Sequence, residues 1–340
     1  CNVVQNRWRP KGKPTACEVR YGGFGDMIQA SSVLPFLKAT GYHVTVMTSP
    51  RGRQVLEYDP HIDQFVVQDD NQVPNHELGP FWKAWARKFD RFINLSESVE
   101  GTLLTIPGRI SHYWPDSLRR KLLNINYLDM VHDIAQVPGP HKPAFYASEG
   151  EREWAFREVP RGFTVMWALA GSSLHKAYPY TDNVIAMILT HMPEATVILV
   201  GDVACQLLEE GWAAEPRVMC RSGKWGIRDT LAAAQRCSVV VGPETGILNA
   251  VSYCETVGKV VLLSHSSEEN LTRGWPNTDA IVPREVPCYP CHRMHYNRDF
   301  CPEASVPVEK HPISQDAKLL EEMTKAGHVR DGRYWTGASV

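Results

Sequence analysis

The sequence of 340 residues lacks any apolar run that approaches the roughly 20 residues needed to span a bilayer. Its first residues, Cys1 to Arg7, lack the apolar core of a secretory signal peptide, and a first residue other than Met suggests a trimmed or incomplete N-terminus. The formal net charge of only −2 leaves no chain-wide electrostatic footprint for nucleic acid. These absences favour a cytoplasmic protein, or one peripheral to the inner membrane. They make nucleic acid an unexpected partner without excluding a local basic patch.

Two common nucleotide-binding motifs are also missing. The glycine-rich turn Gly22-Gly23-Phe24-Gly25-Asp26 has no third glycine where the dinucleotide fingerprint Gly-x-Gly-x-x-Gly needs one. No Gly-Lys-Ser or Gly-Lys-Thr follows it, as a phosphate-binding P-loop would require. The turn therefore predicts a close approach of the backbone to a ligand, but neither of these two sites.

Composition and length indicate a soluble protein with two cores. Hydrophobic residues make up 43% of the chain and charged residues 22%, as in ordinary globular proteins, and 340 residues are many for one core. Two successive runs of strand–helix alternation predict an α/β protein with two Rossmann-like halves, whose parallel sheets face an interdomain cleft. The expected strands are 16–21, 43–47, 62–67, 89–95, 163–167, 195–200, 237–241 and 258–263, and the expected helices are 27–40, 117–136, 182–192, 229–236, 246–254 and 314–326.

The domain order follows from the same alternation and from a proline-rich stretch near the middle of the chain. We expect a helical insertion at 96–143 and a linker around 144–160, where the first run of alternation ends. The expected parts are an N-terminal arm (1–15), an N-terminal Rossmann-like domain (16–158), a C-terminal Rossmann-like domain (159–313) and a C-terminal helix and tail (314–340).

Asp26 follows the glycine turn, at the start of an expected helix. A carboxylate at this position can cap the helix by accepting backbone N–H bonds. It can also be exposed in the cleft and act as a general base on a hydroxyl group. Both interpretations stay open from the residue types alone. In the second, Gly22, Gly23 and Gly25 line the same side of the cleft.

Two loops of the second half carry groups suited to an anion. Hydroxyl groups and a lysine at the end of a strand suit a diphosphate, and the free N–H groups at a helix start favour an anion. An ordinary polar loop, and a capped helix whose dipole is offset by Glu244, are the alternatives. The groups are Ser172, Ser173 and Lys176 in the first loop, and Thr245 and Gly246 in the second.

With these motifs in this order, the chain resembles glycosyltransferase family 9, the heptosyltransferase family of the GT-B fold. That family shows Gly-Asp before an apolar helix with a proline, a Ser/Thr-rich loop with a lysine, and Asp-Thr-Gly-x-x-His. The matching segments are Gly25-Asp26 with Val33-Leu34-Pro35, Ser172-Ser173-Leu174-His175-Lys176, and Glu244-Thr245-Gly246-Ile247-Leu248-Asn249, followed by Ser264-His265-Ser266-Ser267-Glu268 and Gly274-Trp275-Pro276. The order of the motifs carries the resemblance, which covers most of the chain.

The resemblance implies an enzyme of bacterial or phage origin that transfers a hexosyl or heptosyl group. The donor would be a nucleotide-diphosphate-sugar in the C-terminal domain. The acceptor would be a hydroxyl of a glycan, a lipid-linked saccharide or another molecule in the N-terminal domain. The reaction would be inverting and would need no cofactor or metal. By the same resemblance, Asp26 is the catalytic base, Ser172, Ser173, Lys176, Thr245 and Gly246 contact the diphosphate, and Glu244, Asn249, Trp225 and Asp202 lie near the donor sugar or nucleoside.

Two positions depart from the family pattern. Glu244 stands where the family has aspartate, and Asn249 where it has histidine. These departures are compatible with nucleotide-sugar transfer, but they leave open which sugar is transferred. The alternatives are a GT-B enzyme that modifies a protein, a small molecule or DNA bases, a GT-B-like isomerase or hydrolase of the nucleotide sugar, and a catalytically silent nucleotide-sugar-binding protein.

The nine cysteines are unevenly placed. Six are scattered, as expected of reduced thiols in a cytoplasmic protein. Cys288, Cys291 and Cys301 cluster with His292 and His295, and three thiolates with one imidazole would complete a structural zinc or iron site. One disulfide with a free thiol, and three reduced cysteines, are the alternatives that the sequence leaves open.

Overall fold

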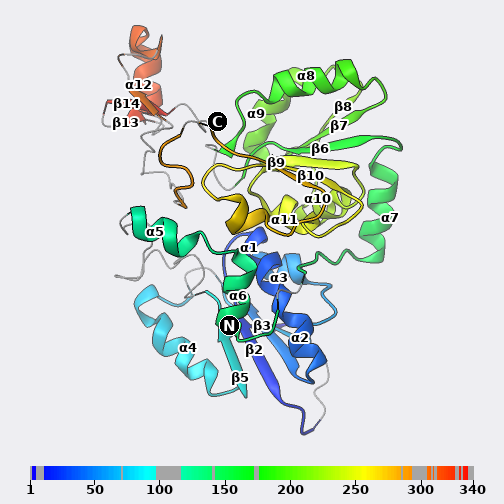
Figure 1. The fold of residues 1–340 in the computed structure, drawn as a ribbon, viewed down its shortest axis with the longest axis vertical. Helices are drawn as coiled ribbons and strands as arrows, with labels where there is room; N and C mark the ends of the chain where they lie inside the picture. Colours follow the sequence, from blue (N-terminus) through cyan, green and yellow to red (C-terminus); the bar gives the residue numbers. More distant parts are fainter. Residues whose placement is uncertain are drawn as a thin grey trace.

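The computed structural model describes residues 2–4, 11–69, 72–96, 116–139, 142–171, 176–284, 286–292, 305–307, 309, 312–325, 329–330 and 332–335. The described chain forms two α/β halves stacked one on the other (Figure 1). Helices α1 (Phe24–Ala30) and α11 (Gly246–Val251) lie where the halves meet. The two-sheet α/β prediction is confirmed.

The first half is built on a five-stranded sheet in the order β1-β4-β3-β2-β5. Strands β2 to β5 are parallel, and β1 pairs antiparallel with β4 at one edge. Because β2 lies between β3 and β5, the turn that follows it opens at the carboxyl edge of an interior strand. The strands are β1 (Asn2–Val4), β2 (Thr15–Val19), β3 (His43–Thr48), β4 (Gln64–Val67) and β5 (Arg91–Asn94).

The helix expected at 27–40 is interrupted by a short 3₁₀ segment. Pro35 is the reason, because it has no N–H to donate and is placed in the first turn of a new helix. The helix expected at 117–136 is also divided, since Asn126 caps a second helix. The helical segments of this half are α1, η1 (Ser31–Val33), α2 (Leu34–Ala39), α3 (Pro50–Leu56), η2 (Asn75–Glu77), α4 (Leu78–Ala86), α5 (Asp116–Leu123) and α6 (Tyr127–Ala135).

The second half has a six-stranded sheet in the order β11-β10-β9-β6-β7-β8. All of its pairings are parallel, so the carboxyl ends of its strands share one edge. The strands are β6 (Thr164–Ala168), β7 (Thr196–Val200), β8 (Val218–Cys220), β9 (Val239–Pro243), β10 (Gly258–Leu262) and β11 (Thr278–Ile281). The helical segments are α7 (Glu149–Glu158), α8 (Thr181–His191), η5 (Val203–Cys205), α9 (Gln206–Glu209), η6 (Glu210–Trp212), α10 (Ile227–Ala234), α11 and η7 (Glu268–Thr272).

Three features differ from the sequence predictions. Asn2–Val4 form an edge strand, because their backbone pairs with β4, and are not part of a separate arm over 1–15. Helix α7 occupies most of the expected linker 144–160 and packs on α10. The short strands β8 and β11 carry too few buried apolar residues to show a pattern.

A small unit lies beside the second half (Figure 1), made of β12 (Ser305–Pro307), η10 (Pro312–Gln315), α12 (Ala317–Lys325), β13 (Val329–Arg330) and β14 (Arg333–Trp335).

Arg228 of α10 ties the second half to the first. The residue is 7% exposed, and its guanidinium group binds both carboxylate oxygens of Glu151, at 2.6 and 2.8 Å. The remaining N–H groups reach main-chain carbonyls of Gln54 and Val55 at the end of α3, and of Tyr146. All five N–H donors of Arg228 therefore have acceptors, three of them in the main chain.

In the described part of the chain, no helix is both long enough and apolar enough to cross a bilayer.

Candidate active site at the boundary between the halves

Asp26 lies in the first turn of α1, the helix that follows β2, an interior strand of the first sheet. Its Oδ2 accepts a hydrogen bond of 2.7 Å from the N–H of Gly23, so the carboxylate caps α1. Gly22 has φ +128°, and a Cβ added there would lie 2.6 Å from the same oxygen. The turn therefore needs glycine at Gly22 both for its backbone and for the approach of the carboxylate. The side chain of Asp26 is 27% exposed, so capping leaves part of it accessible.

The other oxygen of Asp26 faces a buried arginine. Arg20 follows β2, is 1% exposed and places Nη2 3.2 Å from Oδ1 of Asp26. The hydroxyl of Tyr127, the first residue of α6, accepts from Arg20 Nη2 at 2.7 Å and donates to Oδ1 of Asp26 at 3.3 Å. Arg20 and Tyr127, both buried, thus fix the orientation of the Asp26 carboxylate through its Oδ1.

The start of α1 touches the start of α11 in the second half. A Cβ added to Gly246 would lie 2.8 Å from Cβ of Phe24 and 3.1 Å from the backbone nitrogen of Gly25. A Cβ added to Gly25 would overlap the side-chain amide of Asn249. The two glycines let the turn with Asp26 approach the predicted anion site at Gly246.

Asn249 is buried in this contact. Its Oδ1 accepts a hydrogen bond of 2.6 Å from Nε2 of Gln29, and its Nδ2 donates to the carbonyl of Thr245. Only 8% of the residue is exposed. The structure therefore uses Asn249 to join α11 to α1, whereas the resemblance places it near the donor sugar.

Glu244 organises the loop after β10. Its carboxylate accepts from the backbone N–H groups of Ser264, His265 and Ser266, at 2.8 to 3.2 Å, and from the hydroxyl of Ser264. Burial alone would raise the pKa of the Glu244 carboxyl. The charges of His265 and Lys176, with the hydrogen bonds from His265 and Ser264, outweigh burial and hold the pKa well below its usual range. Glu244 is therefore a buried anion that fixes the 264–266 loop.

Lys176 lies beside Glu244 after the carboxyl end of β6. Its Nζ donates to the carbonyl of Glu244 at 3.2 Å and is 3.8 Å from the Glu244 carboxylate. The hydroxyl of Thr245 caps α11 by accepting from the N–H of Leu248. Lys176, Thr245 and Gly246 thus lie together, and their predicted contacts with a diphosphate stay predictions. Ser172 and Ser173 lie outside the described residues.

The two remaining residues that the resemblance places on the donor side lie further along the second sheet. Trp225 follows β8 and packs edge-on against Trp154 of α7, with ring centroids 5.0 Å apart. The guanidinium carbon of Arg221 is 5.8 Å from the centre of the Trp225 ring. Asp202 is exposed after β7, and its Oδ1 accepts from the N–H of Cys205. Their predicted contacts with a nucleoside stay predictions.

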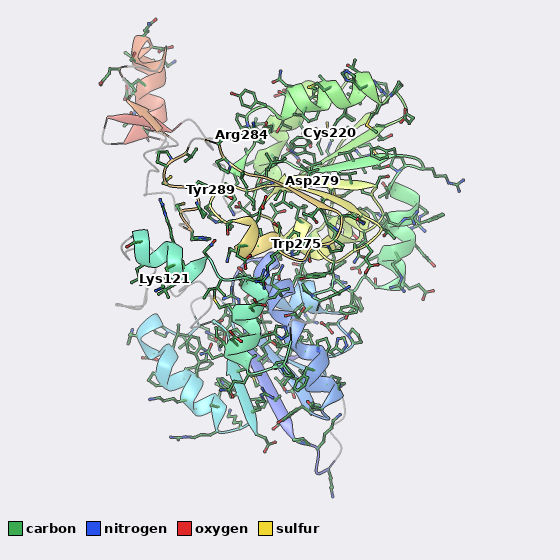
Figure 2. All side chains as sticks on the ribbon, viewed as in Figure 1. Lys121, Cys220, Trp275, Asp279, Arg284 and Tyr289 are labelled. Atoms are coloured by element: carbon green, nitrogen blue, oxygen red, sulfur yellow. The ribbon has the colours of Figure 1, made fainter. Side chains whose placement is uncertain are left out.

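The cysteine loop bridges the halves near the same boundary. The N–H of His292 donates to the carbonyl of His265, and Nε2 of His292 is 3.2 Å from Oδ1 of Asn124. Figure 2 shows Tyr289 of this loop above the helix α5 that carries Lys121. Among the described residues, no three His, Cys, Asp or Glu side chains form a metal-binding group. Cys301 and His295 lie outside the described residues, so the zinc or iron site stays a prediction.

These features define the class as a two-domain α/β protein of the GT-B fold. The carboxylate of Asp26 lies on one side of the boundary between its halves, and Lys176 and the start of α11 lie on the other. Solved structures identify the fold more narrowly. A glycosyl transferase family 9 protein from Veillonella parvula has 16% sequence identity and a TM-score of 0.62, over 83% of this chain and 90% of that chain. The ADP-heptose lps heptosyltransferase II of E. coli has 13% identity and a TM-score of 0.56, over 78% and 90%. The chain therefore has the fold of the family 9 heptosyltransferases, as the resemblance implied.

A third solved structure covers nearly the whole chain. The iron-containing dodecameric glycosyltransferase TibC of enterotoxigenic E. coli has 11% identity and a TM-score of 0.53, over 95% of this chain and 78% of that chain. No protein-family model and no curated protein sequence matches the chain. At these identities the likeness concerns the fold.

Sequence reasoning missed three residues that complete the site. Arg20 directly precedes the glycine turn, and a basic residue there is a visible signal for a partner of Asp26. Tyr127 gave no signal, because 101 positions separate it from Asp26. In the sequence, His265 stands out only as part of the motif after β10. Its contact with Glu244 depends on the pairing of β9 with β10.

Proposed function

We propose that the protein is a glycosyltransferase that moves a sugar from a nucleotide-diphosphate-sugar to an acceptor hydroxyl. The observation that carries the proposal is the contact between α1 and α11, in which Phe24 and Gly25, directly before the partly exposed Asp26, lie against Gly246. A base on one half and an anion-binding loop on the other is the arrangement that displacement of a diphosphate needs.

In the proposed reaction, the acceptor hydroxyl attacks the anomeric carbon while Asp26 takes its proton. The bond from that carbon to the diphosphate breaks, and configuration inverts. Lys176 and the start of α11 balance the charge that develops on the leaving diphosphate, so the chain's own groups supply this stabilisation. Arg20 and Tyr127 keep the Asp26 carboxylate in one orientation before the substrate binds.

Donor binding is the first test. A solved structure of similar fold, E. coli heptosyltransferase WaaC, is a complex with ADP, so ADP-sugars lead the panel and UDP-, GDP- and TDP-sugars follow. Titration calorimetry should detect binding of at least one of them. Lys176→Ala should weaken that binding by about 10- to 100-fold, the loss expected for one charge-assisted phosphate contact. If no donor of the panel binds at millimolar concentration, the proposal fails.

The catalytic role of Asp26 is tested with the donor that binds. Asp26→Asn should leave donor affinity within about twofold and lower transfer by about 10²- to 10⁴-fold, the usual contribution of a general base. The matched control is Asp133→Asn, which removes an exposed carboxylate of α6. Transfer at the wild-type rate by Asp26→Asn would remove Asp26 as the base.

A further inference from the structure

A set of side-chain hydrogen bonds joins the loop before α6 to η7, which belongs to the second half. Asn270 of η7 donates from Nδ2 to the carbonyls of Leu123 and Ile125, at 2.9 and 2.8 Å. In the opposite direction, Asn126 donates from Nδ2 to the carbonyl of Glu269 at 3.1 Å. We name the pair Asn126 and Asn270 the asparagine clasp. Each side chain binds the other half's main chain, so the clasp depends on the relative position of the two halves.

The neighbours of the clasp support the same contact. The hydroxyl of Ser267 donates to Oδ1 of Asn124 and accepts from the N–H of Asn270 at 3.0 Å, so it caps η7 and crosses the boundary at once. Arg273 at the end of η7 forms an ion pair with Asp129 of α6. The second half therefore contacts the segment 123–129 at its start, in the loop before α6 and at Asp129.

The clasp residue Asn126 is also the N-cap of α6. Its Oδ1 accepts from the N–H groups of Leu128 and Asp129, at 3.1 and 3.4 Å. One side chain thus satisfies the start of α6 with its oxygen and holds the second half with its nitrogen. Because a lost cap allows the first turn of a helix to fray, the position of the residue after Asn126 depends on this side chain.

The residue after Asn126 is Tyr127, whose hydroxyl lies between Arg20 and Asp26. Tyr127 is 7% exposed and packs in the core of the first half with α1. Asn270 of η7 therefore reaches the carboxylate of Asp26 in four steps. It binds the carbonyl of Ile125, two covalent steps lead through Asn126 to Tyr127, and the Tyr127 hydroxyl binds Asp26.

We propose that the asparagine clasp makes Tyr127 a positioning residue for Asp26, so that the donor-binding half must dock through Asn270 before the Asp26 carboxylate is held in its reactive orientation. The inference rests on the proposed function for the role of Asp26 as the base. Docking then couples the two halves energetically: when the second half moves away, the start of α6 loosens, and the carboxylate keeps only Arg20 and the N–H of Gly23 as the partners described above. The base is therefore assembled only in the docked enzyme.

Amide hydrogen exchange of the full chain tests the coupling without any substrate. The reporter is the peptide over residues 21–29, because the N–H of Gly23 is bound by Asp26. Asn270→Ala should speed exchange there and over 126–132 by about three- to tenfold, the effect of losing one or two hydrogen bonds. The matched control is Lys142→Ala, which removes an exposed ion pair with Glu255 of the second half and should change neither peptide. Unchanged exchange over 21–29 in Asn270→Ala would overturn the proposal.

A second variant keeps the test sharp if Asn270→Ala folds poorly. Tyr127→Phe keeps the ring in the core and removes only the hydroxyl. It should speed exchange over 21–29 but leave η7 as in the wild type, since the effect runs from the clasp to Asp26. Wild-type exchange over 21–29 in Tyr127→Phe would equally overturn the proposal.

Transfer kinetics separate this inference from the proposed function. With the donor found by titration, Asn270→Ala and Tyr127→Phe should each lower kcat by about three- to tenfold and leave the donor KM within twofold. The double variant should lose no more than the larger single loss, because both changes break one series of contacts. If the losses in kcat of the two single variants multiply in the double variant, the clasp proposal is refuted. The proposed function would still hold if Asp26→Asn lowers transfer as expected. Full transfer by Asp26→Asn would instead refute the role of Asp26 as the base, which belongs to the proposed function. The exchange experiment would then still decide whether the clasp holds the Asp26 turn.

Discussion

Gln29 and Asn249 share a hydrogen bond of 2.6 Å across the boundary between the halves, although 220 positions separate them in the sequence. The bond explains one departure from the family pattern. An asparagine at Asn249 presents an oxygen to Gln29 and a nitrogen to the carbonyl of Thr245 at the same time. A histidine at that position would have to use its two ring nitrogens for these two contacts, with a wider ring.

Gly25→Ala should weaken the contact between the halves. The new methyl group would overlap the side-chain amide of Asn249, which is held by Gln29 and Thr245 and has little room to move. We expect a loss of about 1–3 kcal/mol in the free energy of unfolding, as for overpacking. Gly79→Ala is the matched control, because Gly79 is also the second residue of a helix and a Cβ there meets nothing within 4 Å. It should be neutral or stabilising by up to about 1 kcal/mol. Urea unfolding of both variants provides the comparison.

Arg228→Gln should destabilise the joint between the halves. It leaves the Glu151 carboxylate and the last carbonyls of α3 without the cation, and breaking a buried pair costs about 3–5 kcal/mol. Burial alone would raise the pKa of Glu151, but the hydrogen bond from Arg228 outweighs it and lowers that pKa, in agreement with a charged pair. Thermal unfolding should split into two transitions as the halves separate. The control Arg53→Gln breaks a half-exposed pair with Glu57 and should change stability by no more than about 0.5 kcal/mol. A single transition at the wild-type temperature would contradict the prediction.

Glu18→Gln should change how stability depends on pH. Glu18 of β2 is fully buried, and burial first, then the charge of Asp59, raise its pKa well above the usual value despite Arg20. The folded state therefore keeps a proton that the unfolded chain loses near pH 4.3, so wild-type stability falls as pH rises from about 4.3 toward the folded pKa. The slope in this window approaches about 1.4 kcal/mol per pH unit, and Glu18→Gln should remove it. Urea unfolding between about pH 5 and pH 8 measures the slope, with the exposed Glu153→Gln as control. Parallel pH profiles for wild type and Glu18→Gln would contradict this prediction.

Glu244→Gln should show the opposite pH dependence. The depressed pKa of Glu244 means that its stabilising contribution is present above the unfolded value of about 4.3 and is lost as pH falls through the lower folded pKa. At neutral pH the variant loses the charge opposite Lys176 and points an amide N–H at a backbone N–H, a loss of about 2–4 kcal/mol. The gap between wild type and variant should therefore narrow in acid. A gap that is constant from neutral pH to about pH 3 would show that the charge of Glu244 contributes nothing.

The sequence predicted the elements whose pattern is local. The strands at β3 and β7 are runs of β-branched and apolar residues, and each follows its helix at short spacing, so their order and the two parallel sheets could be predicted. The division of the helix at Pro35 is also a local effect of a missing N–H. The strands β8 and β11, with three and four residues, are too short to carry a period.

The site was predictable only where a motif reports it. Asp26 and Lys176 follow strand ends, and parallel sheets bring strand ends to one edge. The contacts of Asn249 and Tyr127 depend on how the halves dock, and no spacing along the chain encodes this. The carboxylate of Glu244 binds three backbone N–H groups of a loop that lies 20 to 22 residues further on, and the motif that contains Glu244 does not encode these contacts.

The five-acceptor site of Arg228 has a consequence for recombination between related proteins. Glu151 and Arg228 lie on α7 and α10, which pack together, whereas the first half contributes main-chain carbonyls at Gln54 and Val55 and the ring of Tyr58, whose centre is 4.7 Å from the guanidinium carbon. Side chains at those two positions can drift during evolution without loss of the joint. For this joint, a chimaera that replaces the first half would need a helix that ends where α3 ends, with an aromatic ring at the position of Tyr58. The chimaera would also have to keep Gln29, Asn126 and Asp129, whose side chains bind the second half elsewhere along the boundary.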